Sequence, residues 1–146
     1  MTATKTVAEI LGDKYTPAMK EAFPDVDPGI YPYGYLLVVQ LRTPKKKTTG
    51  GIILIDETRD DEIFRSQFGL VRSMGPSAFK RRDTLEPWPE GDWCKVGSFV
   101  RSVLYGGDRW YIPSGNKDQQ VLFVATKDTD LIGELTADPL SFKVNI

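Results

Sequence analysis

The spacing of apolar residues predicts two short helices at the start of the chain. The first is indicated by three residues at helical intervals, Val7, Ile10 and Leu11. Thr16 followed by Pro17 is typical of an N-cap and a first helical turn, and would begin a second helix that stops at Pro24. Turn-forming residues at 24–30 predict a linker. We therefore expect residues 1–30 to form a helical extension.

From Tyr33 onward the pattern changes to one of short strands. Branched and aromatic residues gather in runs that are separated by frequent turn signals. The predicted strands are 35–41, 67–74, 99–104, 109–112 and 121–125, followed by a short element from Asp130. This pattern is typical of a small β-barrel or sandwich. We expect an all-β domain over residues 31–136 and a tail at 137–146.

The predicted strand 67–74 carries one charged residue among apolar ones. Simple alternation would place Phe68, Leu70 and Met74 on one face of the strand. Arg72 interrupts this face. Its presence indicates either a strand at the edge of the sheet or a carboxylate partner.

Four apolar residues, 52–55, lie between two charged stretches. A basic run ending at Gly50-Gly51 precedes them, and the acidic stretch 56–62 follows. Such flanks bury too little apolar surface to offset the entropy of ordering, so the loop 42–65 is expected to be mobile. Its apolar tip would then serve as a docking element. A short interior strand is the alternative, and periodicity alone does not separate the two.

Composition and charge exclude several classes of function. A chain of 146 residues suits one domain, and its net charge of −1 provides no overall attraction to nucleic acid or to an acidic membrane. No apolar run approaches the ~18 residues of a membrane span, and the first residues contain no apolar signal core. These features predict a cytoplasmic protein.

The residues available for chemistry argue against catalysis. The chain has no histidine, the commonest general base and metal ligand. The single cysteine, Cys94, is expected to be a small packed residue. There is no zinc-ligand spacing, no phosphate-binding glycine loop and no distinctive carboxylate pair. We expect no enzyme activity and no catalytic, cofactor-binding or metal-binding residues.

Five features, in order, resemble one known family. They are Pro32 with the strand Leu37-Val38-Val39, the loop tip Gly50-Gly51-Ile52-Ile53-Leu54, the strand 69–75 with its paired glycines, Lys95-Val96-Gly97 with Phe99-Val100, and Val121-Leu122-Phe123 with the ending 130–133. This order resembles the GroES-type co-chaperonins, the ring-shaped lids of group I chaperonins. The match covers roughly residues 32–136 and implies a small, irregular GroES-like β-barrel with a long mobile loop.

The resemblance implies a function as an oligomeric lid. Copies of the chain would assemble into a ring, a heptamer in this family, and dock through Gly50, Gly51, Ile52, Ile53 and Leu54 onto a group I chaperonin of the GroEL type. Docking would close the folding chamber around a non-native substrate protein. ATP would be bound by the chaperonin and not by this chain. The region 76–94 holds the position of the family's roof hairpin. Its aromatic residues Phe79, Trp88 and Trp93 would either face the substrate or anchor a surface loop.

Departures from the family pattern are informative. Ser98 replaces the family's turn aspartate, and residues 1–30 and those after Thr136 have no counterpart in the compact bacterial proteins. Such additions resemble the co-chaperonins of bacteriophages, which would act in the host cytoplasm. The alternatives are a non-catalytic β-barrel structural or adaptor module of a virus particle, and a fragment of an enzyme with a GroES-like barrel. The enzyme fragment is disfavoured because such barrels use cysteine and histidine for zinc.

Overall fold

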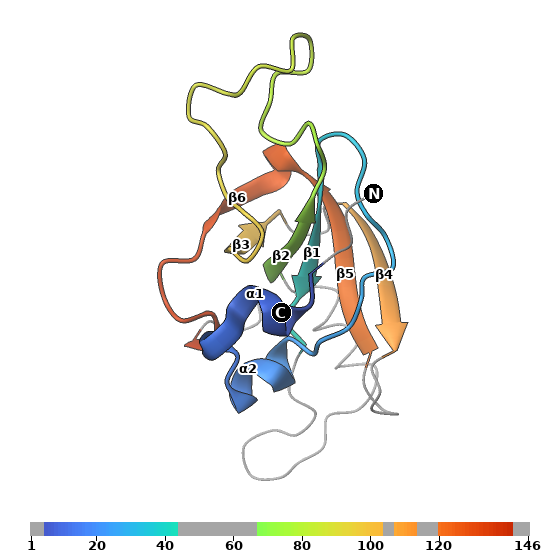
Figure 1. Cartoon of the computed structure of the whole chain (residues 1–146), viewed down its shortest axis with the longest axis vertical. Helices are drawn as coiled ribbons and strands as arrows, with labels where there is room; N and C mark the ends of the chain where they lie inside the picture. Colours follow the sequence, from blue (N-terminus) through green and yellow to red (C-terminus); the bar gives the residue numbers. More distant parts are fainter. Residues whose placement is uncertain (1–4, 44–66, 104–106, 114–119, 142–146) are drawn as a thin grey trace.

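The computed structural model describes residues 5–43, 67–103, 107–113 and 120–141 (Figure 1). These residues form mostly β-structure with a few short helices, as the sequence predicted. The helical elements are α1 (Val7–Leu11), η1 (Gly12–Lys14), α2 (Pro17–Ala22), η2 (Asp128–Asp130) and η3 (Pro139–Ser141). The strands are β1 (Leu36–Leu41), β2 (Phe68–Met74), β3 (Phe99–Ser102), β4 (Asp108–Pro113), β5 (Gln120–Lys127) and β6 (Leu131–Glu134).

Capping side chains determine where the two α-helices begin. The hydroxyl of Thr16 accepts a hydrogen bond from the backbone N–H of Met19 at 3.3 Å, and Pro17 occupies the first turn of α2. This N-cap was predicted from the sequence and is confirmed. Thr6 caps α1 in the same way, accepting from the N–H of Glu9 at 3.1 Å.

The six strands form one antiparallel sheet in the order β4-β5-β1-β2-β3-β6. Among the described strands, β4 and β6 each pair with a single neighbour, so these pairings do not close the sheet. The sheet is nevertheless strongly curved. In a flat sheet β5 and β6 would lie about 19 Å apart, four strand spacings. The three residues of η2 join them directly, and a connection of this length spans at most about 14 Å.

The concave side of the sheet encloses the main core. Alternate residues of β1 point into it, together with residues from four other strands and from the region 78–94. This inner core comprises Leu37, Val39, Leu41, Val71, Ala78, Phe79, Cys94, Val100, Leu122, Val124 and Leu131. Strands near both edges of the sheet contribute, β5 near one edge and β6 at the other, as the curvature requires.

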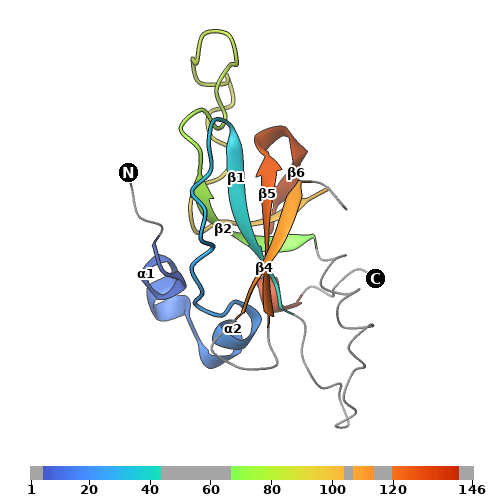
Figure 2. The ribbon, with the colours of Figure 1, turned by 90° about the vertical axis from the view of Figure 1, so that its right-hand side faces the viewer.

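Residues 5–28 cover the convex side of the sheet and are called the N-terminal layer below (Figure 2). Helices α1 and α2 pack over β2 and β3 through a cluster that contains Val7, Leu11, Met19, Ala22, Phe23 and Leu70. A second cluster joins Val26 to Val38, Trp110, Ile112, Val121 and Phe123. The helical extension is therefore an integral layer of the domain.

Residues 24–30 have no helix or strand, as expected of a linker, but they are fastened to the sheet. Three side chains of the sheet donate hydrogen bonds to carbonyl groups of this segment: Gln40 to Pro24 at 2.7 Å, Arg72 to Val26 at 2.8 Å and Trp110 to Pro28 at 2.9 Å. Because each bond joins a different strand to the segment, the path of the chain from α2 to β1 is fixed.

Arg72 occupies neither of the environments that the sequence predicted. Strand β2 lies between β1 and β3, so it is not an edge, and Arg72 is only 2% exposed. Its guanidinium donates to three oxygens instead of a carboxylate: Val26 O at 2.8 Å, Lys5 O at 3.0 Å and Gln40 Oε1 at 2.6 Å. Burial lowers the pKa of Arg72, and the nearby Asp25 and Asp27 oppose this effect.

A β-bulge explains why the predicted face of β2 was wrong. The register with β1 shifts at this point, because Val38 pairs with Ser73 whereas Val39 pairs with Val71. Arg72 is the extra residue, and the bulge changes the alternation of the side chains after it. Met74 therefore packs against the inner core, while Leu70 lies on the opposite face under the helices.

Candidate functional site

The predicted docking residues lie outside the described part of the chain. Gly50, Gly51, Ile52, Ile53 and Leu54 all fall within residues 44–66. The described residues on either side, Thr43 and Gln67, show how this segment joins the sheet. We call Arg42 and Thr43 its upstream root and Gln67 its downstream root.

The upstream root is held by the N-terminal layer. The N–H of Thr43 donates to the carbonyl of Ala22, the last residue of α2, at 2.8 Å, and Thr43 is buried. Arg42 donates its N–H to the carbonyl of Phe68 at 3.2 Å. Burial lowers the pKa of Arg42, and the nearby carboxylate of Asp138 opposes this effect.

The downstream root is held by β3. The side-chain amide of Gln67 donates to the carbonyl of Ser102 at 2.9 Å, and the N–H of Ser102 donates to the carbonyl of Gln67 at 3.0 Å. Arg101 donates to the side-chain oxygen of Gln67 at 3.2 Å. Sequence reasoning missed Gln67, because a single polar residue before a strand carries no signal of its own.

Residues 76–94 project from one end of the sheet as a long hairpin-like loop (Figure 1). Its aromatic residues form a cluster: the ring centroids of Phe79 and Trp88 are 5.6 Å apart in an edge-to-face contact, and those of Trp88 and Trp93 are 4.9 Å apart with the rings tilted. Phe79 is completely buried in the inner core, Trp88 is half-buried and Trp93 is 41% exposed. Phe79 was a candidate for facing a substrate, and its burial makes it an anchor of the loop instead.

Asp128 and Arg82 fix the base of this loop. The buried carboxylate of Asp128 accepts from the N–H of Phe79 at 2.9 Å and forms an ion pair with Arg82. The Arg82 guanidinium lies over the ring of Tyr35, 3.9 Å from its centroid. Lys80 and Pro87 form an isolated β-bridge below the tip. The sequence gives no signal of this bracing role, because a short basic run such as 80–82 is usually solvated surface charge.

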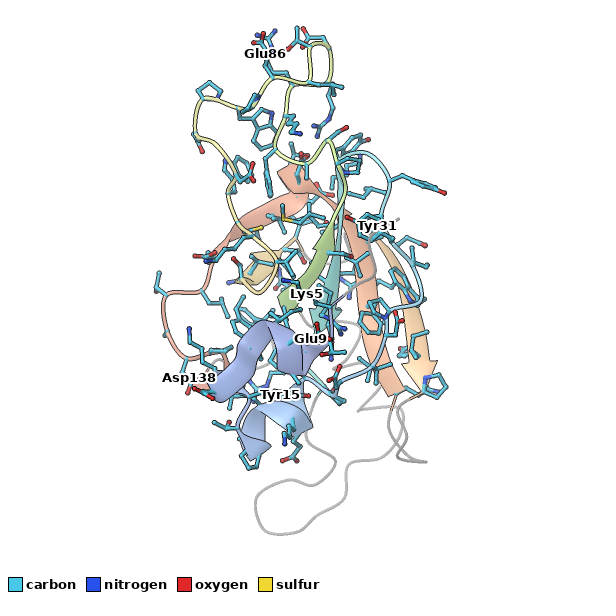
Figure 3. All side chains as sticks on the ribbon, viewed as in Figure 1. Lys5, Glu9, Tyr15, Tyr31, Glu86 and Asp138 are labelled. Atoms are coloured by element: carbon cyan, nitrogen blue, oxygen red, sulfur yellow. The ribbon has the colours of Figure 1, made fainter. Side chains whose placement is uncertain are left out.

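The tip of the loop presents a strained, exposed leucine. Leu85 has a φ of 61° and is 56% exposed, and its N–H donates to the carbonyl of Arg81 at 2.9 Å. Residues other than glycine, asparagine and aspartate rarely adopt this conformation. Glu86 lies beside it at the far end of the loop (Figure 3).

Exposed apolar residues gather on two flanks of the molecule. On one flank the extended backbone before β1 carries Ile30, Tyr31 and Tyr33, with exposures of 49%, 38% and 88% (Figure 3). The other flank is the edge of β6 to which no strand of the described ranges is paired, beside a hollow of about 360 Å³. The hollow is lined by Glu90, Trp93, Cys94, Val100, Leu131, Ile132, Gly133 and Glu134.

The turn before β3 keeps its local hydrogen bonds despite the serine at its end. The N–H of Lys95 donates to Oγ of Ser98 at 3.1 Å, and the N–H of Ser98 donates to the carbonyl of Lys95 at 3.0 Å. Ser98 therefore supplies a side-chain acceptor for this turn.

The remaining observations concern the cysteine, groups that could hold a metal ion, and long apolar helices. Cys94 is buried, and desolvation, reinforced by the carboxylates of Glu134 and Asp92, raises its pKa to about 12. Within the described ranges, no group of three or more His, Cys, Asp or Glu residues could hold a metal ion. None of the helices in this part of the chain is long and apolar enough to cross a membrane. No protein-family model matches the chain, and no curated protein matches it significantly.

Proposed function

We propose that this protein is a co-chaperonin, an oligomeric lid that docks through residues 50–54 onto an ATP-bound group I chaperonin. One observation carries the proposal. Strands β1 and β2 are adjacent and antiparallel, and their ladder ends at the pair Leu41 and Gly69. Such strands need a connection of only about two to five residues. The chain instead places the whole stretch 42–67 between them, with an apolar tip between charged flanks. Long connections of this kind are usually functional.

The curvature of the sheet supports a GroES-like β-barrel as the finer description of the fold. The short link between β5 and β6 bends the sheet. The inner core contains residues from strands near both edges of the sheet. The long connection joins the first two strands, β1 and β2, and the projecting loop 76–94 follows β2. This order of elements is the one that the family resemblance implies.

Self-assembly into a ring, a heptamer by the family resemblance, is supported by the two apolar flanks. A free strand edge is a template for pairing with another chain. The edge of β6 with its hollow and the exposed segment 30–33 are different surfaces of one molecule. A contact between two different surfaces is heterologous and produces a closed ring when the rotation allows it. Each copy would then present its β6 edge to one neighbour and its segment 30–33 to the other.

Weak docking by each loop would sum to tight capping. Burial of two isoleucines and a leucine stabilises the complex by about 1.5–3 kcal/mol for each side chain. Ordering the loop costs about 1–2 kcal/mol for each backbone residue that becomes fixed, so the net gain per loop is small. In a ring the loops bind with a high effective concentration. Each loop tip would dock in an apolar groove of the chaperonin. A modest loss of affinity at every groove would therefore release the lid.

The chamber would enclose a non-native protein, and no chemistry is assigned to this chain. ATP would act on the chaperonin alone. Trp93, supported from below by Trp88, is the more exposed aromatic residue in the projecting loop and is our candidate for contact with the enclosed substrate. The additions to the compact family pattern favour a bacteriophage co-chaperonin that works in the cytoplasm of its host.

The decisive experiment is the native mass of this protein mixed with a purified group I chaperonin, with and without ATP. We expect a complex that forms with ATP and contains one ring of this chain, whose mass also counts the subunits. Ile53→Asp should abolish this complex and leave the free ring assembled, because it puts a charge into an apolar groove. Thr58→Asp is the matched control, since it adds the same charge outside the tip.

Two results would contradict the proposal. Capping by the Ile53→Asp variant would remove the docking assignment. No complex with either of two chaperonins, together with a defined free oligomer, would favour the structural or adaptor module of a virus particle.

A further inference from the structure

We propose that the N-terminal layer positions the proposed docking residues 50–54. It does so by holding the upstream root, Arg42 and Thr43. The inference rests on the proposed function, because it concerns how strongly that segment docks. It assigns a role to the residues that the compact family pattern lacks.

None of the described strands pairs with the upstream root at Thr43. The pairs of β1 with β2 end at Leu41, and those with β5 end at Gln40. Beyond this point the N–H of Thr43 is bonded to the carbonyl of Ala22, at the end of α2, and Thr43 is 8% exposed. The layer thus extends the ordered path of the chain past the end of the sheet.

Helix α2 is firmly placed. Met19, Ala22 and Phe23 are buried in the cluster above β2 and β3, and the ring of Phe23 lies 5.4 Å from that of Phe99. The hydroxyl of Tyr15 donates to the carbonyl of Phe23 at 2.7 Å. Because α2 is held in this way, the carbonyl of Ala22 is a rigid acceptor for the N–H of Thr43.

The last described turn, η3, reaches the same place from the other end of the chain. It contacts α2, and Leu140 packs against the cluster of the helices. Asp138, two residues earlier, lies close enough to Arg42 to act on its charge. Both additions to the family pattern therefore converge on the upstream root.

Holding the root in place strengthens docking by reducing the entropy that binding must remove. If α2 loosens, Arg42 and Thr43 gain freedom in the free protein and lose it again on docking. Ordering one backbone residue corresponds to about a tenfold change in affinity. In a ring the change acts at every loop, so capping should weaken by more than tenfold.

The test compares two core truncations on opposite faces of the sheet. Met19→Ala removes a side chain from the cluster that holds α2. Val124→Ala removes one from the inner core, on the face away from the N-terminal layer. Both variants are studied as complete chains with the chaperonin and ATP, at a temperature at which native mass shows the ring intact. Should Met19→Ala not fold, Leu140→Ala replaces it, since Leu140 is only partly buried.

Two readouts separate positioning from general stability. We expect Met19→Ala to accelerate hydrogen exchange at the Thr43 amide and to weaken capping by more than tenfold. Val124→Ala should change neither, although it also destabilises the fold. Unchanged capping by Met19→Ala with faster exchange at Thr43 would overturn the inference, and so would equal weakening by Val124→Ala. Failure of the wild-type protein to bind the chaperonin would instead overturn the proposed function.

Discussion

Replacement of Arg72 by methionine should destabilise the free protein by about 3–5 kcal/mol. The guanidinium donates to two main-chain carbonyls and one side-chain amide at 2.6–3.0 Å, and the side chain is almost completely buried. Methionine fills a similar volume but leaves three acceptors without their donor. Hydrogen bonds from a charged group contribute about 1.5–3 kcal/mol each, and removing one side of a buried network costs about 3–5 kcal/mol.

Urea unfolding at a fixed protein concentration measures this loss. In a chain of this size, 1 kcal/mol shifts the melting temperature by about 2–4 °C, so we expect a decrease of roughly 10 °C. Arg72→Lys should lose nearly as much, because an ammonium group lacks the planar fork that reaches all three oxygens. Hydrogen exchange should also increase in the N-terminal layer, which Arg72 joins to β1 and β2.

Arg81→Met is the matched control for this prediction. Arg81 pairs with Asp83 on the surface, with both side chains more than half exposed, so its replacement should change the stability by no more than about 0.5 kcal/mol. A loss below about 1 kcal/mol for Arg72→Met would refute the reasoning. It would mean that water or a rearranged chain satisfies the three acceptors without the arginine.

Two further predictions concern the strained leucine and the buried thiol. Leu85→Asn should stabilise the protein by about 0.5–1 kcal/mol in thermal unfolding, because asparagine tolerates the positive φ, while Leu85→Ala should bring no gain. Cys94 should react slowly with thiol reagents at pH 8 in the folded protein, since its pKa is raised to about 12. The unfolded thiol ionises first, so this contribution to stability is complete below about pH 8.5 and is lost as the pH rises toward 12; Cys94→Ala should show a flatter pH dependence. Rapid labelling of the folded protein would contradict the burial of the thiol.

The sequence was most informative where local chemistry decides the structure. Thr16 and Pro17 define the start of α2, and the branched run before Arg42 is strand β1. The glycines of the strand 69–75 also have a structural reason. A Cβ atom on Gly75 would overlap the carbonyl oxygen of Gly34, and one on Gly69 would overlap Val39 and Gln40.

Features that depend on distant partners were not predictable from the sequence. Arg72 was misplaced because its acceptors are main-chain carbonyls, which every residue possesses and no pattern reveals. The bulge at the same residue inverted the expected position of Met74. Phe79 looked like its aromatic neighbours in the sequence, and only the curvature of the sheet places it inside the core. The identity of residues 50–54 as a docking tip stays a prediction, since they lie outside the described residues.

The packing of the N-terminal layer has a consequence for synthesis of the protein on the ribosome. Arg72 bonds the carbonyl of Lys5, 67 positions earlier, and Phe23 packs on Phe99. At about 5–20 residues per second, the ribosome needs roughly 4–15 s to travel from Phe23 to Phe99. During that interval the apolar side chains of α1 and α2 have no sheet to cover, and a chain that terminates early never acquires one. The nascent protein itself therefore passes through a stage in which it requires protection from aggregation.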